Sequence, residues 1–304
     1  MIQSFCRCLA LALLLASSAC AAPECPYTEG KVLCRLQSPL IQESSGLVAS
    51  SRSDDYFFTH NDSGDGPNLY AVNRKGEVLA TLRVTGAAHL DWEDMARGPD
   101  EKGKPALYLG DIGDNLGFRP VVSVYRIPEP VIDATRIGIS AATAPALRFD
   151  LQYEDGAHDA ETLLVHPRTG QVFIVTKARK SSAVYVAPTP LRAGRINRLR
   201  KVAEVNFGPF PPVAGSQRHA DDNFLVTGGD ISPDGKRVVV RTYANAYEWK
   251  VEQDDMAGAF RRQPVRIPLP AVSGGEAIAY SRNGRSLLTS SEGLNTPVYE
   301  LLRR

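Results

Sequence analysis

Hydrophobic residues in this chain fall in short runs rather than at the three- and four-residue spacing of an amphipathic helix. The runs are rich in β-branched and aromatic residues, as at 56–59, 106–109, 172–175 and 237–240, and Gly, Pro, Asn or Asp bound them. Short apolar runs separated by turn residues are typical of β-strands. The pattern therefore predicts an all-β fold.

One short element, polar at its start and apolar at its end, returns along the chain at 43–49, 91–96, 159–165, 228–232 and 274–279. Each copy leads into a turn and a second apolar strand, then a third strand that carries an aromatic residue; in all but the last copy a fourth strand follows. Four antiparallel strands, repeated, form a propeller blade. We expect a single β-propeller of five blades, or of six if the region 209–222 supplies degenerate strands.

The last repeat ends after its third strand, whereas the segment 31–36 precedes the first repeat and has no partner there. We expect this N-terminal strand to close the last blade, because that pairing removes an exposed sheet edge. Cys25 and Cys34 are the two cysteines of the folded part. In an oxidising compartment such a pair predicts a disulfide that braces the closure.

The first 22 residues have the layout of a cleaved secretory signal peptide: Arg7, an apolar run at 8–15 and small residues at 16–22. The run is too short to cross a bilayer, which needs about 20 residues. We expect residues 1–22 to be removed and 23–304 to form the propeller domain of a periplasmic or secreted protein. The alternative is a lipoprotein acylated at Cys20, and no transmembrane segment is expected elsewhere.

Charge and motifs exclude several functions. Lys and Arg number 35 against 34 Asp and Glu, a formal net charge of +1. This balance favours neither nucleic acid nor an anionic membrane as a partner. The chain contains no nucleophile elbow, phosphate-binding loop or dinucleotide fingerprint. We expect a monomer whose partner is a small anionic molecule or a protein ligand.

Carboxylates recur where each repeat begins. Glu43, Asp91 and Asp159 lie there, and the candidate ligands are Glu93, Glu161, Asp230 and Glu276. The innermost strand of each blade lines the central channel, so these side chains are expected to converge at one mouth. Like charges in a small space repel by several kcal/mol, and Ca²⁺ accepts six to eight oxygen ligands. The sequence therefore predicts a Ca²⁺ site; the alternative is that the carboxylates cap backbone amides or pair with Arg and Lys.

Other polar residues are expected at the same mouth. His89 and His158 each precede a carboxylate of the ring, and a histidine there acts either as a general base or as a hydrogen-bonded partner. His60, Lys177 and Arg241 lie at the ends of second strands. They are candidates to bind an anionic substrate, or, in the case of Lys177 and Arg241, to act as counter-ions of the carboxylates.

The motifs at 91–96, 110–115, 124–130, 159–161 and 275–280 resemble a group of bacterial secreted propellers of unassigned activity. That group is more distantly similar to the senescence marker protein and gluconolactonase family, to phytase-like propellers and to SdiA-regulated periplasmic proteins. Those relatives place acidic ligands around a calcium ion, which implies Glu93, Glu161, Asp230 and Glu276 as ligands. In the first repeat Ser45 occupies the position that holds a carboxylate in the other four, so the ring of carboxylates is incomplete.

Three functions are compatible with these residues. The first is a calcium-dependent hydrolase of an ester or phosphoester, since the distant relatives act on lactones or phytate. The second is a non-catalytic periplasmic module that binds a ligand or protein on the same face. The third is a structural propeller in which a metal braces the blades. The sequence does not decide whether the protein is an enzyme.

Overall fold

The computed structural model describes residues 25–62, 64–208 and 223–304. The predicted signal peptide and the lipid anchor at Cys20 therefore lie outside the described residues. Strands dominate the rest, and α1 (Met256–Phe260) is the single α-helix in the described ranges. No described helix has the length and apolar character needed to cross a membrane.

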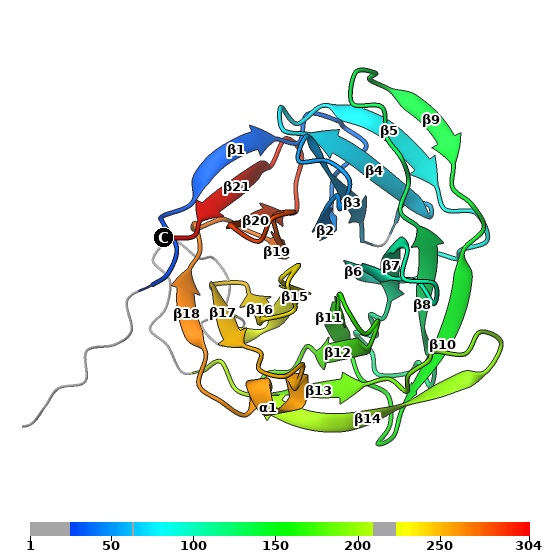
Figure 1. The fold of residues 1–304 in the computed structure, drawn as a ribbon, viewed down its shortest axis with the longest axis vertical. Helices are drawn as coiled ribbons and strands as arrows, with labels where there is room; N and C mark the ends of the chain where they lie inside the picture. Colours follow the sequence, from blue (N-terminus) through cyan, green and yellow to red (C-terminus); the bar gives the residue numbers. More distant parts are fainter. Residues whose placement is uncertain (1–24, 63, 209–222) are drawn as a thin grey trace, which may run out of the picture.

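Two sheets build the first part of the ring (Figure 1). In the first sheet the order is β2 (Ser44–Ala49), β3 (Tyr56–Asn61), β4 (Asn68–Asn73), β5 (Val78–Arg83) and β9 (Ile139–Ala142). The second has eight strands, in the order β6 (Trp92–Pro99), β7 (Pro105–Asp111), β8 (Val122–Pro128), β10 (Leu147–Tyr153), β14 (Ile196–Val205), β13 (Ser182–Val186), β12 (Val172–Thr176) and β11 (Ala160–Val165). Parallel pairing of β10 with β14 joins its two antiparallel halves.

Two four-stranded sheets complete the ring. One has the order β15 (Val226–Ile231), β16 (Arg237–Thr242), β17 (Asn245–Lys250) and β18 (Val265–Pro268). The other has the order β19 (Gly275–Tyr280), β20 (Ser286–Ser291), β21 (Pro297–Leu302) and β1 (Lys31–Arg35). In both sheets each strand is antiparallel to its neighbours.

The sheets are arranged radially around one axis (Figure 1). The innermost strands β2, β6, β11, β15 and β19 contact one another in that order, and β19 contacts β2 to close the circle. The prediction of an all-β propeller is thus confirmed. The number of blades is not given by the number of sheets, because the largest sheet contains two antiparallel halves. The region 209–222, which would hold a sixth blade, lies outside the described residues.

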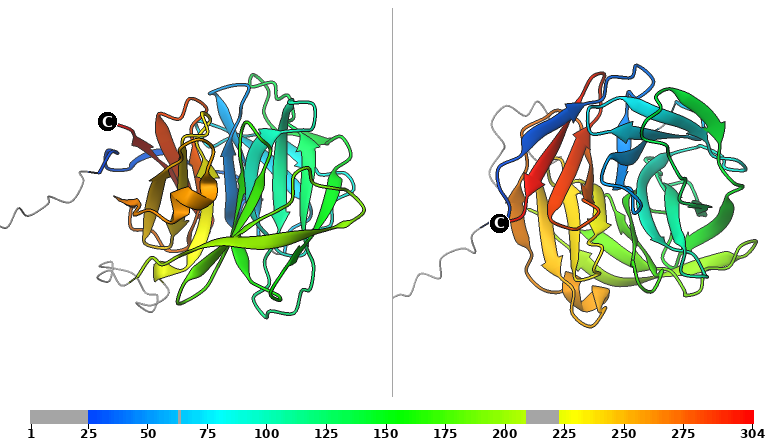
Figure 2. Two further views of the ribbon diagram at one scale, coloured as in Figure 1. Left: turned by 60° about the horizontal axis from the view of Figure 1, so that its bottom comes forward. Right: turned by 45° about the horizontal axis from the view of Figure 1, so that its top comes forward.

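The N-terminal strand closes the ring as expected, with β1 antiparallel to β21 (Figure 2). Tyr27, just before β1, donates a hydrogen bond of 2.5 Å from its hydroxyl to Glu248 of β17. Arg303, just after β21, donates to the same carboxylate at 3.0 Å. Both ends of the described chain are therefore fixed to the neighbouring sheet by one buried side chain.

The predicted disulfide between Cys25 and Cys34 is wrong for this structure, in which both residues are free thiols. Cys34 is buried in an apolar cluster with Leu36 and Ile41, and burial raises the pKa of its thiol to about 11. Cys25 packs against a different cluster that contains Tyr27. The two sulfurs thus belong to separate cores, so closure of the ring depends on strand pairing and the Glu248 contacts.

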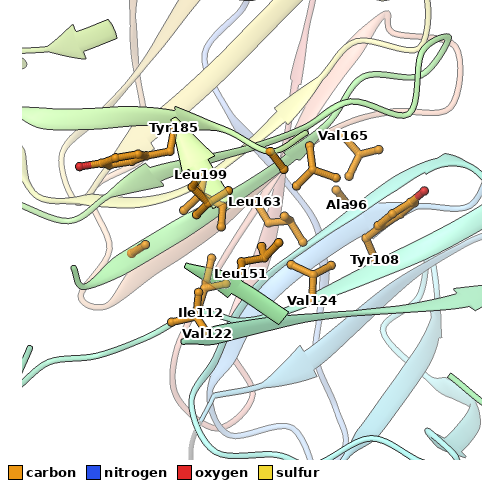
Figure 3. Close-up of a cluster of buried hydrophobic side chains, with 14 of the residues drawn as sticks. Ala96, Tyr108, Ile112, Val122, Val124, Leu151, Leu163, Val165, Tyr185 and Leu199 are labelled. Atoms are coloured by element: carbon orange, nitrogen blue, oxygen red, sulfur yellow. The ribbon is translucent and has the colours of Figure 1, made fainter. Parts of the chain in front are cut away.

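Separate apolar clusters fill the spaces between neighbouring sheets. The cluster between the two halves of the eight-stranded sheet includes Ile112, Leu163 and Tyr185 (Figure 3). Burial of each large apolar side chain contributes about 1.5–3 kcal/mol. Because such a core lies on each side of an innermost strand, the polar residues at the strand starts are presented from a rigid frame.

Candidate metal centre at the channel mouth

Each innermost strand carries a register shift near its start. The shifts lie between Ser44 and Gly46, Trp92 and Asp94, Ala160 and Thr162, Val226 and Gly228, and Gly275 and Ile278. A β-bulge of this kind changes the direction of the side chain at the extra residue. The strands consequently present an equivalent set of residues at the mouth, namely Ser45, Glu93, Glu161, Thr227 and Glu276.

The two hydroxyl residues in this set bind backbone. Ser45 donates from Oγ to the Glu93 carbonyl at 2.5 Å, and Thr227 donates from Oγ1 to the Glu276 carbonyl at 2.9 Å. Each bond joins one innermost strand to the next at its bulge. The hydroxyls therefore fix the backbone of the two neighbouring glutamates.

Two groups of three carboxylates meet at the mouth. Oxygens of Asp62, Asp91 and Glu93 lie within 4.8 Å of one another, and so do oxygens of Glu93, Asp159 and Glu161. Glu93 belongs to both groups. The structure thus brings Glu93 and Glu161 together, and it adds three aspartates that were not among the candidate ligands from sequence.

The glutamates are nearly inaccessible, with exposed fractions of 2% for Glu93 and 3% each for Glu161 and Glu276. Desolvation raises the pKa of all three, and repulsion from Glu161 raises it further for the other two. The pKa of Glu161 itself is raised to about 7, although Lys177 opposes the shift. A cation among these carboxylates would lower the cost of keeping them ionised.

Two further observations show that the residues fit a cation. The Oε2 atom of Glu276 is buried and has no hydrogen-bond partner among the described residues. Gly113 lies against the carboxylates, and a Cβ there would come closer than 3.0 Å to oxygens of Glu93 and Asp91. The site therefore combines an unsatisfied buried acceptor with a backbone that leaves room for the carboxylates. Hard oxygen donors alone suit Ca²⁺ or Mg²⁺.

The two predicted anion-binding cations are already engaged. Lys177 forms an ion pair with Glu161, and its ammonium lies 5.6 Å from the ring centroid of Tyr243. Burial lowers the pKa of Lys177, but the Glu161 carboxylate outweighs this effect and raises it above the ordinary value. Arg241 is 1% exposed and donates to the backbone carbonyls of Ala277 and Ser290 at 3.0 and 3.1 Å. The ion pair of Lys177 fits the counter-ion alternative, whereas Arg241 donates its hydrogen bonds to backbone carbonyls and to the Thr289 hydroxyl.

His60 and His89 lie side by side near Asp62. His60 is fully buried, with Nδ1 2.8 Å from the Asn61 carbonyl oxygen. Burial lowers its pKa to about 4, so His60 is neutral at pH 7. The Nε2 atom of His89 is 3.3 Å from the same carbonyl, and its ring packs on Trp92 with centroids 4.8 Å apart. His60 is therefore shielded from solvent. His89 contacts Asn61, the residue that precedes Asp62.

His158 has a different environment. Its Nε2 atom is 2.9 Å from Oδ1 of Asp155 and 2.9 Å from the Tyr185 hydroxyl. Tyr185 belongs to β13, the third strand of its blade, so this contact lies away from the axis. The structure does not bring His158 together with the carboxylate groups.

Asp230 is also not at the mouth. It lies farther along β15 than the bulge residue Thr227. Its oxygens accept hydrogen bonds from the backbone amides of Ile231 and Tyr280, both at 2.8 Å. The carboxylate of Asp230 thus connects two innermost strands inside the channel, which is the capping alternative raised from sequence.

Sequence reasoning missed Asp62 as a ligand candidate, because it follows a second strand rather than beginning a repeat. Asp91 and Asp159 begin repeats and were expected at this mouth, but the set of candidate ligands took only one carboxylate from each repeat. Thr227 was missed because the repeats were aligned on charge. The signal for Thr227 is the register shift, which is a property of strand pairing.

Comparison with known proteins shows similarity only at the level of fold. No family model matches the chain, and no curated protein matches it. Similar solved structures include the PQQ-bound aldose sugar dehydrogenase from Streptomyces coelicolor, at 10% identity and TM-score 0.48, covering 93% of this chain and 100% of that one. A gluconolactonase from Xanthomonas campestris has 12% identity and TM-score 0.48, with 90% and 89% covered. The WD40 repeats of RRP9 have 10% identity and TM-score 0.44, with 91% and 100% covered.

Replacing Gly113 by alanine is expected to weaken cation binding about tenfold, because the new Cβ would displace the carboxylates of Glu93 and Asp91. Calcium titration calorimetry measures the change. Gly66→Ala is the matched control, since a Cβ there meets only Asn68 at 3.4 Å. Equal affinities for Gly113→Ala and the unaltered protein would show that these two carboxylates do not hold the ion.

Without metal, stability is expected to fall as pH rises from 5 to 8. Desolvation raises the pKa of Asp230 to about 6 in the folded state. A raised folded pKa contributes stability that is complete below the unfolded pKa and is lost as pH rises through the folded value. The change from 3.8 corresponds to about 3 kcal/mol for this fully buried group. Carboxylates whose pKa is lowered in the folded state, such as Asp155, change the free energy of unfolding only in more acidic solution.

Urea unfolding in EDTA at pH 5, 6, 7 and 8 tests this dependence. Asp230→Asn is expected to reduce the slope between pH 5 and 8, because it removes the titrating group while keeping the side-chain shape. A free energy of unfolding that rises over this range in the unaltered protein would contradict the assignment.

Proposed function

We propose that the channel mouth is a calcium centre and that the protein is an exported hydrolase of an ester or phosphoester that uses it. One observation carries the proposal: two groups of three carboxylates share Glu93 in a nearly inaccessible site. When bound, Ca²⁺ would polarise a carbonyl or phosphoryl oxygen of the substrate. The residues that would hold it are Asp62, Asp91, Glu93, Asp159 and Glu161, with Glu276 beside them.

This chain's own residues supply the remaining roles. His89 is the candidate proton acceptor, because it borders Asn61 and Asp62 at the edge of the carboxylate groups. Histidine is the side chain that most often serves as a general base in hydrolysis. Lys177 is the candidate to bind the negative charge of a substrate, because its ion-pair partner Glu161 would coordinate the metal ion instead.

Metal analysis and turnover assays test the proposal together. Purified protein is expected to contain calcium and to melt at a lower temperature after chelation. It is also expected to hydrolyse at least one member of a panel of lactones, phosphomonoesters and aryl esters. Absence of metal together with an unchanged melting temperature in chelator would eliminate the calcium centre.

A second candidate function is non-catalytic binding of a ligand or protein at the same mouth. The observation that favours it is the engagement of Lys177 by Glu161 and of Arg241 by backbone carbonyls. Retained calcium with no turnover on the whole panel would support this function over hydrolysis.

We also propose five blades, a monomer and export. Five innermost strands, each at the head of an antiparallel set, support the blade count when the eight-stranded sheet is divided at the β10–β14 pairing. The proposal of export depends on the residue layout at 1–22. Mass spectrometry of the protein purified from its native host tests this proposal. A mature chain that begins after residue 21 or 22 is expected, whereas an acylated Cys20 would show the lipoprotein form.

A further inference from the structure

A cavity of about 500 Å³ opens at the other end of the channel. Its lining includes Ser51, Arg97, Pro167, Pro233 and Arg282, residues at or just beyond the far ends of the innermost strands. The strand β6 begins beside Glu93 and ends at Pro99, so this cavity and the carboxylates lie on opposite faces of the propeller. The cavity is therefore a site distinct from the proposed calcium centre.

Arg97 is a buried charge in this cavity, and the part of the chain that the structure describes offers it no ion-pair partner. Its exposed fraction is 8%, and no carboxylate of the described residues lies within 4.0 Å of its guanidinium. Its hydrogen bonds are two long ones, to the carbonyls of Ala49 at 3.3 Å and Ser281 at 3.2 Å. Asp230 and Glu129 act on it only at longer range. A buried cation without a contact anion is costly, so the remaining N–H groups of Arg97 are open to an acceptor.

The other charged residues of the cavity are satisfied. Glu129 accepts from the Ser50 hydroxyl at 2.7 Å and from the Ser51 amide at 2.9 Å. Arg282 pairs with Asp54 at 3.1 Å and has an exposed side-chain fraction of 44%. The cavity thus contains one unpaired cation at its inner end and a second arginine at its rim.

Proline rings supply the apolar part of the wall. Pro99, Pro105, Pro167 and Pro233 all line the cavity. Proline has no backbone donor and a fixed φ, so this wall is rigid and offers few hydrogen bonds. The chemistry of the cavity suits a ligand with a negatively charged head and an apolar body.

We propose that this cavity binds a small organic anion, whose carboxylate or phosphate head contacts Arg97 and whose apolar body packs on the prolines. Guanidinium groups recognise both heads through paired N–H donors. Arg282 at the rim adds attraction for the same charge. The site operates whether or not the carboxylate mouth binds calcium.

Calorimetry with benzoate, phenylphosphonate and neutral benzamide tests the proposal and separates the two anionic heads, and the phosphonate is not a phosphoester that the opposite mouth could hydrolyse. At least one of the two anions is expected to bind, and benzamide is expected to bind at least tenfold more weakly. Arg97→Met keeps the apolar stem and is expected to reduce anion affinity at least tenfold. Arg262→Met, which changes an exposed arginine outside the cavity, is the control and is expected to leave anion affinity unchanged. Failure of both anions to bind at 10 mM would overturn the proposal.

Two milder variants keep the test decisive if Arg97→Met does not fold. Arg282→Gln alters a half-exposed side chain and is expected to weaken the anion about threefold. Glu129→Gln removes the negative charge of the cavity and is expected to strengthen anion binding, an effect that a purely structural role would not produce. Unchanged anion affinity in both variants would contradict the proposed site.

Discussion

Replacing Glu93 by glutamine is expected to weaken calcium binding about 100-fold, or about 2.7 kcal/mol. Glu93 is the residue that both carboxylate groups share, so this change removes a ligand from each group at once. The amide keeps the shape of the side chain, but it removes a negative charge and replaces one oxygen by a hydrogen-bond donor. Calcium affinity depends strongly on the number of charged ligands. Titration calorimetry of the full chain measures the loss.

The same variant is expected to be more stable than the unaltered protein when no metal is present. Burial and three neighbouring carboxylates raise the pKa of Glu93, so its negative charge opposes folding. Glu252→Gln is the control, because Glu252 is an exposed carboxylate paired with Arg262. Unchanged calcium affinity in both Glu93→Gln and Glu161→Gln would remove the proposed ligand set.

Replacing Asp94 by alanine is expected to lower the free energy of unfolding by about 3–5 kcal/mol. Its carboxylate accepts backbone hydrogen bonds from Met95 at 2.8 Å, Leu163 at 3.0 Å and Gly229 at 3.3 Å. These amides belong to β6, β11 and β15, so one side chain connects three innermost strands. Alanine would leave buried N–H groups without acceptors, and each such loss costs about 1–3 kcal/mol. Denaturant unfolding monitored by circular dichroism measures the difference.

Asp94→Asn distinguishes lost hydrogen bonds from lost charge. It keeps one oxygen acceptor and is expected to cost less than the alanine variant. Asp100→Ala is the matched control, because Asp100 accepts comparable backbone hydrogen bonds in an exposed turn. A loss below about 1 kcal/mol for Asp94→Ala would show that the three contacts across the channel contribute little.

Local patterns in the sequence were sufficient for the all-β propeller class, but not for the parallel pairing of β10 with β14. Short apolar runs and turn residues located the strands, and the unpaired segment at 31–36 correctly predicted the strand that closes the ring. The disulfide could not be predicted in the same way. Whether Cys25 and Cys34 meet depends on which core each side chain enters, and that is decided by tertiary packing.

The site was predictable where charge and backbone geometry coincide. Glu93, Glu161 and Glu276 occupy bulges and are carboxylates, so alignment on charge found them. In the fourth repeat the bulge holds Thr227, and the nearest carboxylate, Asp230, binds backbone amides instead. A register shift arises from pairing between two strands and is therefore hidden in a single sequence.

The parallel junction of β10 with β14 has a mechanical consequence for the mouth. The innermost strands β6 and β11 are the two edges of the eight-stranded sheet, and they contact each other across its packed interior. Glu93 and Glu161 therefore sit on opposite sides of the seam of a nearly closed cylinder. Both strands are anchored in one continuous sheet, so their packing fixes the spacing of these carboxylates. If the proposed calcium centre binds its ion, little reorganisation of the chain would accompany binding, which favours high affinity.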